Sequence, residues 1–126
     1  MSQPSFNPED MVPLSDVMYG IIVALSSGEM HGYAIMKEIE AMTNNKLSLS
    51  PTTLYRNIRT LKKDGLLEEV PPPPGEEAID ERRRYYKLTA LGRKVGRAHW
   101  QYTERLNHKA QEAFGGAGFA LLGRGR

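Results

Sequence analysis

One segment, residues 50 to 65, carries the signals for both ends of a helix and has two chemically different sides. At 3.6 residues per turn, its apolar side chains fall on one stripe and its cationic and hydroxyl side chains on the opposite one. The apolar stripe is Leu54, Ile58 and Leu61, and the opposite stripe is Thr52, Arg56, Arg59 and Lys63. Ser50 suits the N-cap, Pro51 the first helical position and Gly65 the end. The segment therefore predicts a helix that packs on a core and presents a cationic side outward, as a DNA-reading helix does.

Two more helices are expected before this segment. From about residue 15 to residue 27, apolar side chains recur at helical spacing, with Ser15 as a plausible cap and Gly28 as the stop. A second helix is expected from about residue 32 to residue 43, because its isoleucines again share one side. Between the second and third helices, residues 47 to 49 are expected to form a very short strand.

A hairpin and a long helix are expected after the third helix. Leu66 to Val70 and Arg83 to Leu88 have the composition of two antiparallel strands. Their connection begins with Pro71 to Pro74, a stiff run without N–H donors, and continues with a polar acidic stretch to Glu81. Residues 89 to 114 then show apolar side chains every three to four positions, with Thr89 as the cap.

This order of elements is typical of a winged helix-turn-helix with an added C-terminal helix. The expected fold class is mainly α with a small β-wing. We expect a flexible arm over residues 1–13 and a winged helix domain over 14–88. A helix that joins two copies of the chain is expected over 89–114, and a flexible glycine-rich tail over 115–126.

Positive charge is concentrated in two parts of a chain whose net charge is only +2. Residues 1–45 hold one basic residue, Lys37, against six acidic ones. Residues 50–63 and residues 82–97 reverse this balance, because both windows are basic and contain no acidic residue. Such clustering favours a polyanionic partner on one face, and a solvated basic surface is the alternative.

Catalysis has little support in the sequence. The chain has no cysteine, and its three histidines, His31, His99 and His108, are widely separated. The sequence contains no glycine-rich phosphate-binding motif and no local set of nucleophile and base. We therefore expect no enzymatic activity, no cofactor and no metal. No secretory signal or apolar run of about 20 residues is visible, and a cytoplasmic location is expected.

Four segments together resemble the PadR family of bacterial transcriptional regulators, in its short form with a single C-terminal helix. They are Met30 to Ile35, Leu49 to Tyr55, Leu61 to Leu66 and Arg84 to Gly92. The resemblance implies a homodimer that binds a roughly palindromic operator on double-stranded DNA and usually represses. It also implies release from DNA by a small aromatic or cationic effector.

The candidate DNA-binding residues lie on the second and third helices and on the wing. They are Tyr33, Lys37, Ser50, Thr52, Thr53, Tyr55, Arg56, Arg59, Lys63, Arg82, Arg83 and Arg84. Arg56 and Arg59 are the first choice for base contacts, because the guanidinium fork matches guanine edges. For Ser50 an N-cap role, and for Tyr55 a packed position, are equally compatible with the sequence. Tyr86 is expected in the core, because alternation places it on the same face as Leu88.

The acidic stretch before the wing arginines offers an alternative to DNA contact. Its residues Glu76, Glu77, Asp80 and Glu81 would be repelled by DNA or would pair with the arginines in the free protein. We expect the arginines, and not this acidic tip, to contact DNA.

The last helix is expected to pair with its copy. The predicted seam is Leu91, Val95, Ala98, Tyr102 and Leu106, and Gly92 and Gly96 are expected to allow close approach. Trp100 and Tyr102 are candidate ligand-binding residues between subunits, with ordinary packing as the alternative. A different class of function, a winged helix that binds a protein partner and no DNA, is also compatible with the sequence.

Overall fold

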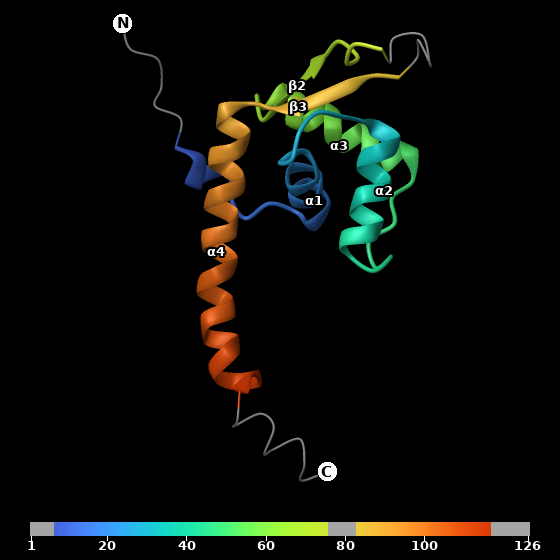
Figure 1. Cartoon of the computed structure of the whole chain (residues 1–126). Coiled ribbons are helices and arrows are strands. Elements are labelled where there is room, and N and C mark those ends of the chain that lie inside the picture. The colour runs from blue at the N-terminus through green and yellow to red at the C-terminus, as the bar shows by residue number, and fades with distance from the viewer. Residues whose placement is uncertain (1–6, 76–82, 117–126) are drawn as a thin grey trace, which may run out of the picture.

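The computed structural model describes residues 7–75 and 83–116, which form three helices around a shared core, a small sheet and a long fourth helix (Figure 1). The helical elements are η1 (Pro8–Met11, a 3-10 helix), α1 (Asp16–Leu25), α2 (Gly32–Met42), α3 (Pro51–Lys63) and α4 (Ala90–Phe114). The strands are β1 (Met30–His31), β2 (Leu67–Val70) and β3 (Tyr85–Leu88), in the order β1-β3-β2 with antiparallel pairing. The fold is a winged helix-turn-helix, as expected.

Helix α1 is the centre of the packing. It contacts α2, α3, α4 and β3, and its Ile21 and Leu25 are almost completely buried. The core side chains that other elements add come from the apolar stripe of each helix. They are Ile35 and Ile39 from α2, Leu54, Ile58 and Leu61 from α3, and Val95 from α4. Burial of these stripes fixes which side of α3 faces solvent.

Side-chain caps begin three helices where the sequence indicated them. Ser15, Ser50 and Thr89 each accept a hydrogen bond from the backbone N–H three residues later, at 3.1, 3.1 and 3.0 Å. A further cap was not foreseen: His31 Nδ1 accepts from the Ala34 N–H at 3.2 Å and begins α2. Histidine is an uncommon N-cap, so the usual cap residues did not indicate it.

Two expectations for the shorter elements were wrong. Residues 47–49 do not form a strand, and the third strand is instead Met30–His31, which pairs with Tyr86 and Tyr85 of β3. A strand of two residues is too short for an alternation pattern to show. Within the arm, where little regular structure was expected, Pro8–Met11 form a 3-10 helix, and Met11 packs on the core.

The first half of α4 belongs to the core of the domain. Val95 is fully buried and Ala98 is 8% exposed, so the prediction that these two residues form a seam between copies was wrong. Gly92 lies against the Leu66 carbonyl, and Gly96 has room for no more than its hydrogen beside Ile22. The two glycines therefore permit close approach between elements of the same chain.

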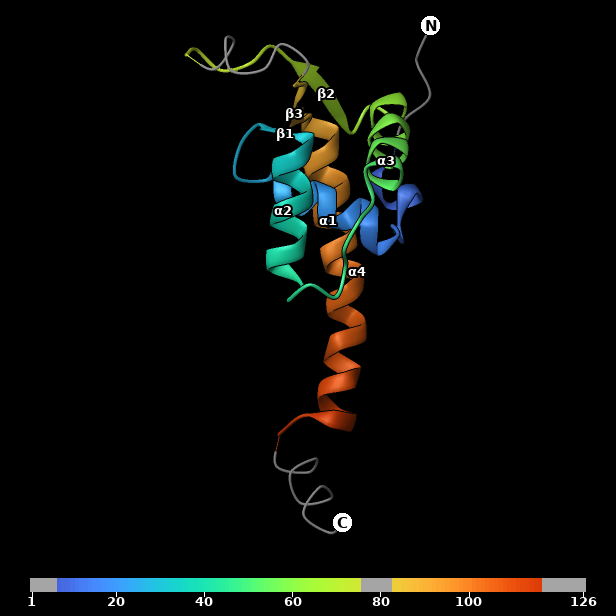
Figure 2. The ribbon, with the colours of Figure 1, turned by 90° about the vertical axis from the view of Figure 1, so that its right-hand side faces the viewer.

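The second half of α4 extends past the other helices, as the two perpendicular views agree (Figures 1 and 2). Exposed apolar side chains on this half are Leu106 and Phe114, and Trp100 is exposed just before it. Among the described residues, no helix is long and apolar enough to cross a membrane.

Candidate nucleic-acid interface

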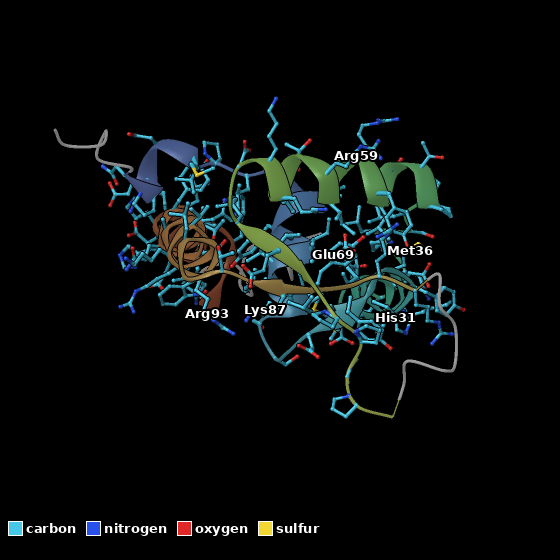
Figure 3. The ribbon with its side chains drawn as sticks, turned by 90° about the horizontal axis from the view of Figure 1, so that it is seen from above. His31, Met36, Arg59, Glu69, Lys87 and Arg93 are labelled. Atoms are coloured by element: carbon cyan, nitrogen blue, oxygen red, sulfur yellow. The ribbon has the colours of Figure 1, made fainter. Side chains whose placement is uncertain are left out.

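Helix α3 presents the side of mixed hydroxyl and cationic residues that the sequence predicted. Leu54, Ile58 and Leu61 are no more than 1% exposed, which turns the opposite stripe outward. The residues of that stripe, Thr52, Arg56, Arg59 and Lys63, are all exposed. Figure 3 shows Arg59 on α3, at the edge of the domain. No acidic side chain lies on α3, so this surface has a single sign of charge.

Hydroxyl groups at the N-terminal turn of α3 already take part in hydrogen bonds within the chain. Ser50 Oγ accepts from the Thr53 N–H and lies 3.1 Å from Thr53 Oγ1. Ser50 therefore acts as the N-cap that the sequence offered as an alternative. Tyr55 packs over the start of α2. Its phenol lies so close to Gly32 that a Cβ at that position would collide with it. The same ring remains 38% exposed, so packing leaves part of it accessible.

Tyr33 and Lys37 of α2 form a small exposed group beside this turn. The Lys37 ammonium lies 5.4 Å from the centre of the Tyr33 ring, a cation–π distance. Lys37 also pairs with Glu40 at 3.5 Å. The Glu40 carboxylate, and then Tyr33, raise the pKa of Lys37, so this side chain is cationic at neutral pH.

A hollow of about 400 Å³ separates α3 from the wing. Its lining residues come from α3, β2, β3 and the residue before β3, and they are Tyr55, Ile58, Arg59, Lys62, Glu69, Arg84 and Tyr86. Glu69 joins the two sides, accepting from Arg84 Nη1 at 2.8 Å and from Lys62 Nζ at 3.3 Å. These hydrogen bonds, that of Arg84 first, lower the pKa of Glu69 although its partial burial opposes them.

No motif in the sequence pointed to Glu69. Alternation along β2 was the available signal, because it places Glu69 on the same face as the buried Leu67. On β3, Tyr86 is buried as predicted, and burial raises the pKa of its phenol. Tyr85, on the other face, is buried as well, because its ring packs edge-on against His31 with centroids 5.3 Å apart.

The two wing arginines that the structure describes, Arg83 and Arg84, have different neighbours. Arg84 turns toward α3 and Glu69, whereas Arg83 Nη1 lies 3.4 Å from His31 Nε2 at the start of α2. Arg82 lies outside the described residues, as do the acidic residues Glu76, Glu77, Asp80 and Glu81.

The second basic window is divided between two sides of the domain. Figure 3 places Arg93 and Arg59 on opposite edges, and Arg93 donates to the Ser26 carbonyl at 3.4 Å. Arg93 and Arg97 line the same small hollow beside α1. These two arginines therefore do not extend the cationic side of α3.

The candidate ligand residues of α4 do not converge within one subunit. Trp100 is 52% exposed, while Tyr102 is half-buried with its ring 5.6 Å from that of His99. Two positions apart on a helix, they point about 160° apart. Among the described residues, no group of three His, Asp or Glu side chains is arranged to hold a metal ion.

A three-helix core with an exposed cationic third helix, followed by a wing, defines a winged helix-turn-helix protein of the DNA-binding type. The chain belongs to the PadR-like family of transcriptional regulators, whose family model matches residues 21–98. This is a family of regulators and not of enzymes, and the resemblance recognised in the sequence is confirmed.

Solved structures share the fold. A transcriptional regulator from Clostridium thermocellum is 28% identical, with a TM-score of 0.59 over 78% of this chain and 97% of that one. Bacillus subtilis PadR, solved in complex with operator DNA, is 22% identical, with a TM-score of 0.54 over 65% of this chain and 45% of that one. The PcaV regulator of Streptomyces coelicolor, solved with its natural ligand, is 21% identical, with a TM-score of 0.63 over 79% of this chain and 62% of that one. Among curated protein sequences, none matches this chain significantly.

Proposed function

We propose that the protein is a sequence-specific DNA-binding repressor that acts as a homodimer on a roughly palindromic operator. The observation that carries the proposal is the side of α3 that is free of acidic residues, exposed along its length while the opposite side is locked in the core. A helix of this kind fits the major groove of B-DNA, which is about 12 Å wide. The relative from Bacillus subtilis solved with operator DNA supports the same role for this fold.

Within this proposal, Arg56 and Arg59 read base edges, and the flanking groups hold the phosphate backbone. Bidentate arginine contacts to guanine are the commonest specific contact in the major groove. The exposed hydroxyl of Thr52 and the Lys63 ammonium lie at the two ends of α3, where phosphates flank a bound helix. Tyr33 and Lys37 contact the backbone from α2, and Arg83 contacts it from the wing. Arg84 contacts the backbone only where it leaves the Glu69 carboxylate, with which it pairs at 2.8 Å in the free protein.

A pair of double variants tests the assigned face. Arg56→Ala/Arg59→Ala should weaken binding to DNA from upstream of the protein's own gene by at least about 30-fold for each half-site, since each of the two bidentate base contacts contributes about 1–3 kcal/mol. Arg93→Ala/Arg97→Ala removes the same charge from the opposite edge of the domain and should have a much smaller effect. Fluorescence anisotropy over a range of salt concentrations gives both affinities.

The outcomes separate the candidate functions. Equal losses in the two double variants would mean that net charge, and not the α3 face, governs binding. A wild-type protein without DNA affinity even at low salt would contradict the proposal and favour a winged helix that binds a protein partner. Repression is tested by a reporter placed behind the same upstream DNA, whose expression should rise when the gene for this protein is deleted.

The dimer is proposed to form through the second half of α4. Tyr102 and Leu106 of the predicted seam lie on this half, and Ala110 and Ala113 continue the stripe at helical spacing. Leu91 instead packs on the core of its own subunit. Two copies joined in this way would place their α3 helices symmetrically, which matches a palindromic operator.

A small effector is proposed to bind between subunits beside Trp100. Because the chain has a single tryptophan, its fluorescence reports directly on this position. Planar aromatic or cationic compounds that bind there should quench the emission and weaken DNA binding in parallel. Unchanged emission across a broad panel of such compounds would count against an effector site at Trp100.

A further inference from the structure

Glu69 is the one acidic residue among the described residues that line the hollow between α3 and the wing. The antiparallel register places it opposite Tyr86, on the face of the sheet that packs toward α3. Its neighbour Glu68 lies opposite Lys87, with which it pairs at 3.4 Å on the other face of the sheet. Figure 3 shows Glu69 between α3 and β3. The two adjacent carboxylates therefore differ in the surface that they face.

The Glu69 carboxylate occupies a position that suits an anion. Arg84 donates to one oxygen at 2.8 Å and Lys62 to the other at 3.3 Å, with Arg59 lining the same hollow. The first distance is that of a charge-assisted hydrogen bond, the type of contact that arginine makes with phosphate. In the free protein, Glu69 thus pairs with Arg84 and Lys62. Without Glu69, these two cations would be available to a DNA backbone lying along α3 and the wing.

Glu69 also carries the same charge as a phosphate. The pKa of its carboxyl group is lowered by Arg84, so the group is ionised at neutral pH. A phosphate that approaches Arg84 or Lys62 must compete with this carboxylate and is repelled by it. Contacts between cations and phosphates supply nearly all of non-specific DNA affinity, so a carboxylate at this point acts mainly on that component.

We propose that Glu69 is a specificity-determining residue, which withholds Lys62 and Arg84 from phosphates and so weakens binding to non-operator DNA. Specificity is a difference between two affinities, and a repulsive group that lowers the competing one increases it. The inference rests on the proposed function and deepens it. A purely structural role, in which Glu69 ties the wing to α3, predicts the opposite effect, because loosening the wing would weaken binding to every DNA.

The test compares Glu69→Gln with Glu68→Gln. Both substitutions remove one negative charge from adjacent positions of β2, but only the first frees Lys62 and Arg84. Binding is measured by anisotropy with a labelled random-sequence duplex of about three helical turns, long enough for two half-sites. Circular dichroism and thermal unfolding establish that each variant is folded.

Glu69→Gln should bind this random duplex about three- to tenfold more tightly, and its plot of log K against log salt should steepen by about one to two. Glu68→Gln should show a smaller gain and no comparable change in slope. Adding Arg84→Gln to Glu69→Gln should remove most of the gain, because the freed cation is then absent. Weaker binding by Glu69→Gln, or equal gains in the two glutamine variants, would overturn the proposal.

Retention on immobilised heparin separates this inference from the proposed function. A wild-type protein that binds no DNA even at low salt contradicts the proposed function. The salt needed for elution from heparin still reports whether Glu69 withholds cations from a polyanion. Later elution of Glu69→Gln than of Glu68→Gln would support the withholding of cations, and identical elution would contradict it.

Discussion

His99 of α4 accepts a hydrogen bond at Nδ1 from the backbone N–H of Leu14, at 3.0 Å. The two residues are 85 positions apart in the chain, and the bond holds the segment that follows η1 against α4. The His99 ring is almost fully buried, with the Tyr19 ring centred 4.3 Å away. Because Nδ1 is the acceptor, the proton of the neutral ring must be on Nε2.

The burial of this ring makes stability depend on pH. Burial lowers the pKa of His99, and the nearby Asp16 carboxylate only partly opposes that effect. The unfolded chain therefore binds a proton at His99 more readily than the folded chain does. The stabilisation is fully present above the ordinary histidine pKa of about 6.5 and is lost as pH falls below it. The loss should be at most about 1.4 kcal/mol per pH unit.

Urea unfolding at several values between about pH 7.5 and about pH 5 tests the prediction. Wild-type protein should unfold at progressively lower urea as pH falls. His99→Gln should be less stable at neutral pH, with a flatter dependence on pH. His108→Gln is the control, because His108 is exposed on the outer half of α4. Parallel pH curves for wild type and His99→Gln would show that another group is responsible.

Gly92 and Gly20 should respond in opposite directions to the same substitution. A Cβ at Gly92 would collide with the Leu66 carbonyl, which cannot yield because it accepts a hydrogen bond from the Thr89 N–H. A Cβ at Gly20 would meet Ile39 at 3.5 Å or more, an ordinary contact. Gly92→Ala should therefore destabilise by about 1–3 kcal/mol, as overpacking does.

Gly20→Ala should stabilise by up to about 1 kcal/mol, because alanine is the better helix former. Both values come from chemical denaturation monitored by circular dichroism. Stabilisation by Gly92→Ala would mean that the Leu66 backbone and α4 can separate at this point at little cost.

The regular elements could be predicted from sequence because their signals are local. In α3, the cap at Ser50 and the burial of Leu54 both follow from spacing within one helix, and the structure has both. The apolar stripe of α4 that contains Val95 was also predicted. Periodicity, however, indicates only that this side of the helix packs against another element. Whether that element is α1 of the same chain or a second copy of the chain depends on contacts between distant segments. Val95 and Gly92 were therefore assigned to the wrong partner.

The wing shows the same limit. Alternation along β3 predicted that Tyr86 is buried, but Tyr85 is buried too, because β1 brings His31 against its ring. Nothing in a two-residue strand reveals that pairing in advance. The pairing of Glu69 with Lys62 and Arg84 likewise joins three separate elements. Contacts of this kind need the folded chain.

Gly32 and Tyr55 should be energetically coupled. The Tyr55 phenol lies against the Gly32 backbone, where it sets how α3 sits on the start of α2. Gly32→Ala should displace that ring, lowering thermal stability and DNA affinity. The same substitution in a Tyr55→Ala background should cost much less. Residues in contact commonly show coupling of about 0.5–3 kcal/mol in such a cycle. Additive losses would mean that the ring moves aside freely.

Leu106 should decide the oligomeric state. It is 58% exposed on the half of α4 that extends beyond the domain, whereas Val95 on the same helix is completely buried. In a two-fold dimer each substitution acts twice. Loss of a buried leucine contact of about 1.5–3 kcal/mol per subunit should weaken the dimer by about 3–6 kcal/mol, roughly a hundredfold or more in Kd.

Leu106→Glu is therefore expected to give a folded monomer, measured by sedimentation velocity over a range of concentrations. Gln101→Glu is the matched control, because it also adds one negative charge but points about 140° away around the helix. It should remain dimeric. Since a monomer presents a single α3, Leu106→Glu should also bind a palindromic site far more weakly than the control. A dimer that persists in Leu106→Glu would move the interface away from the second half of α4.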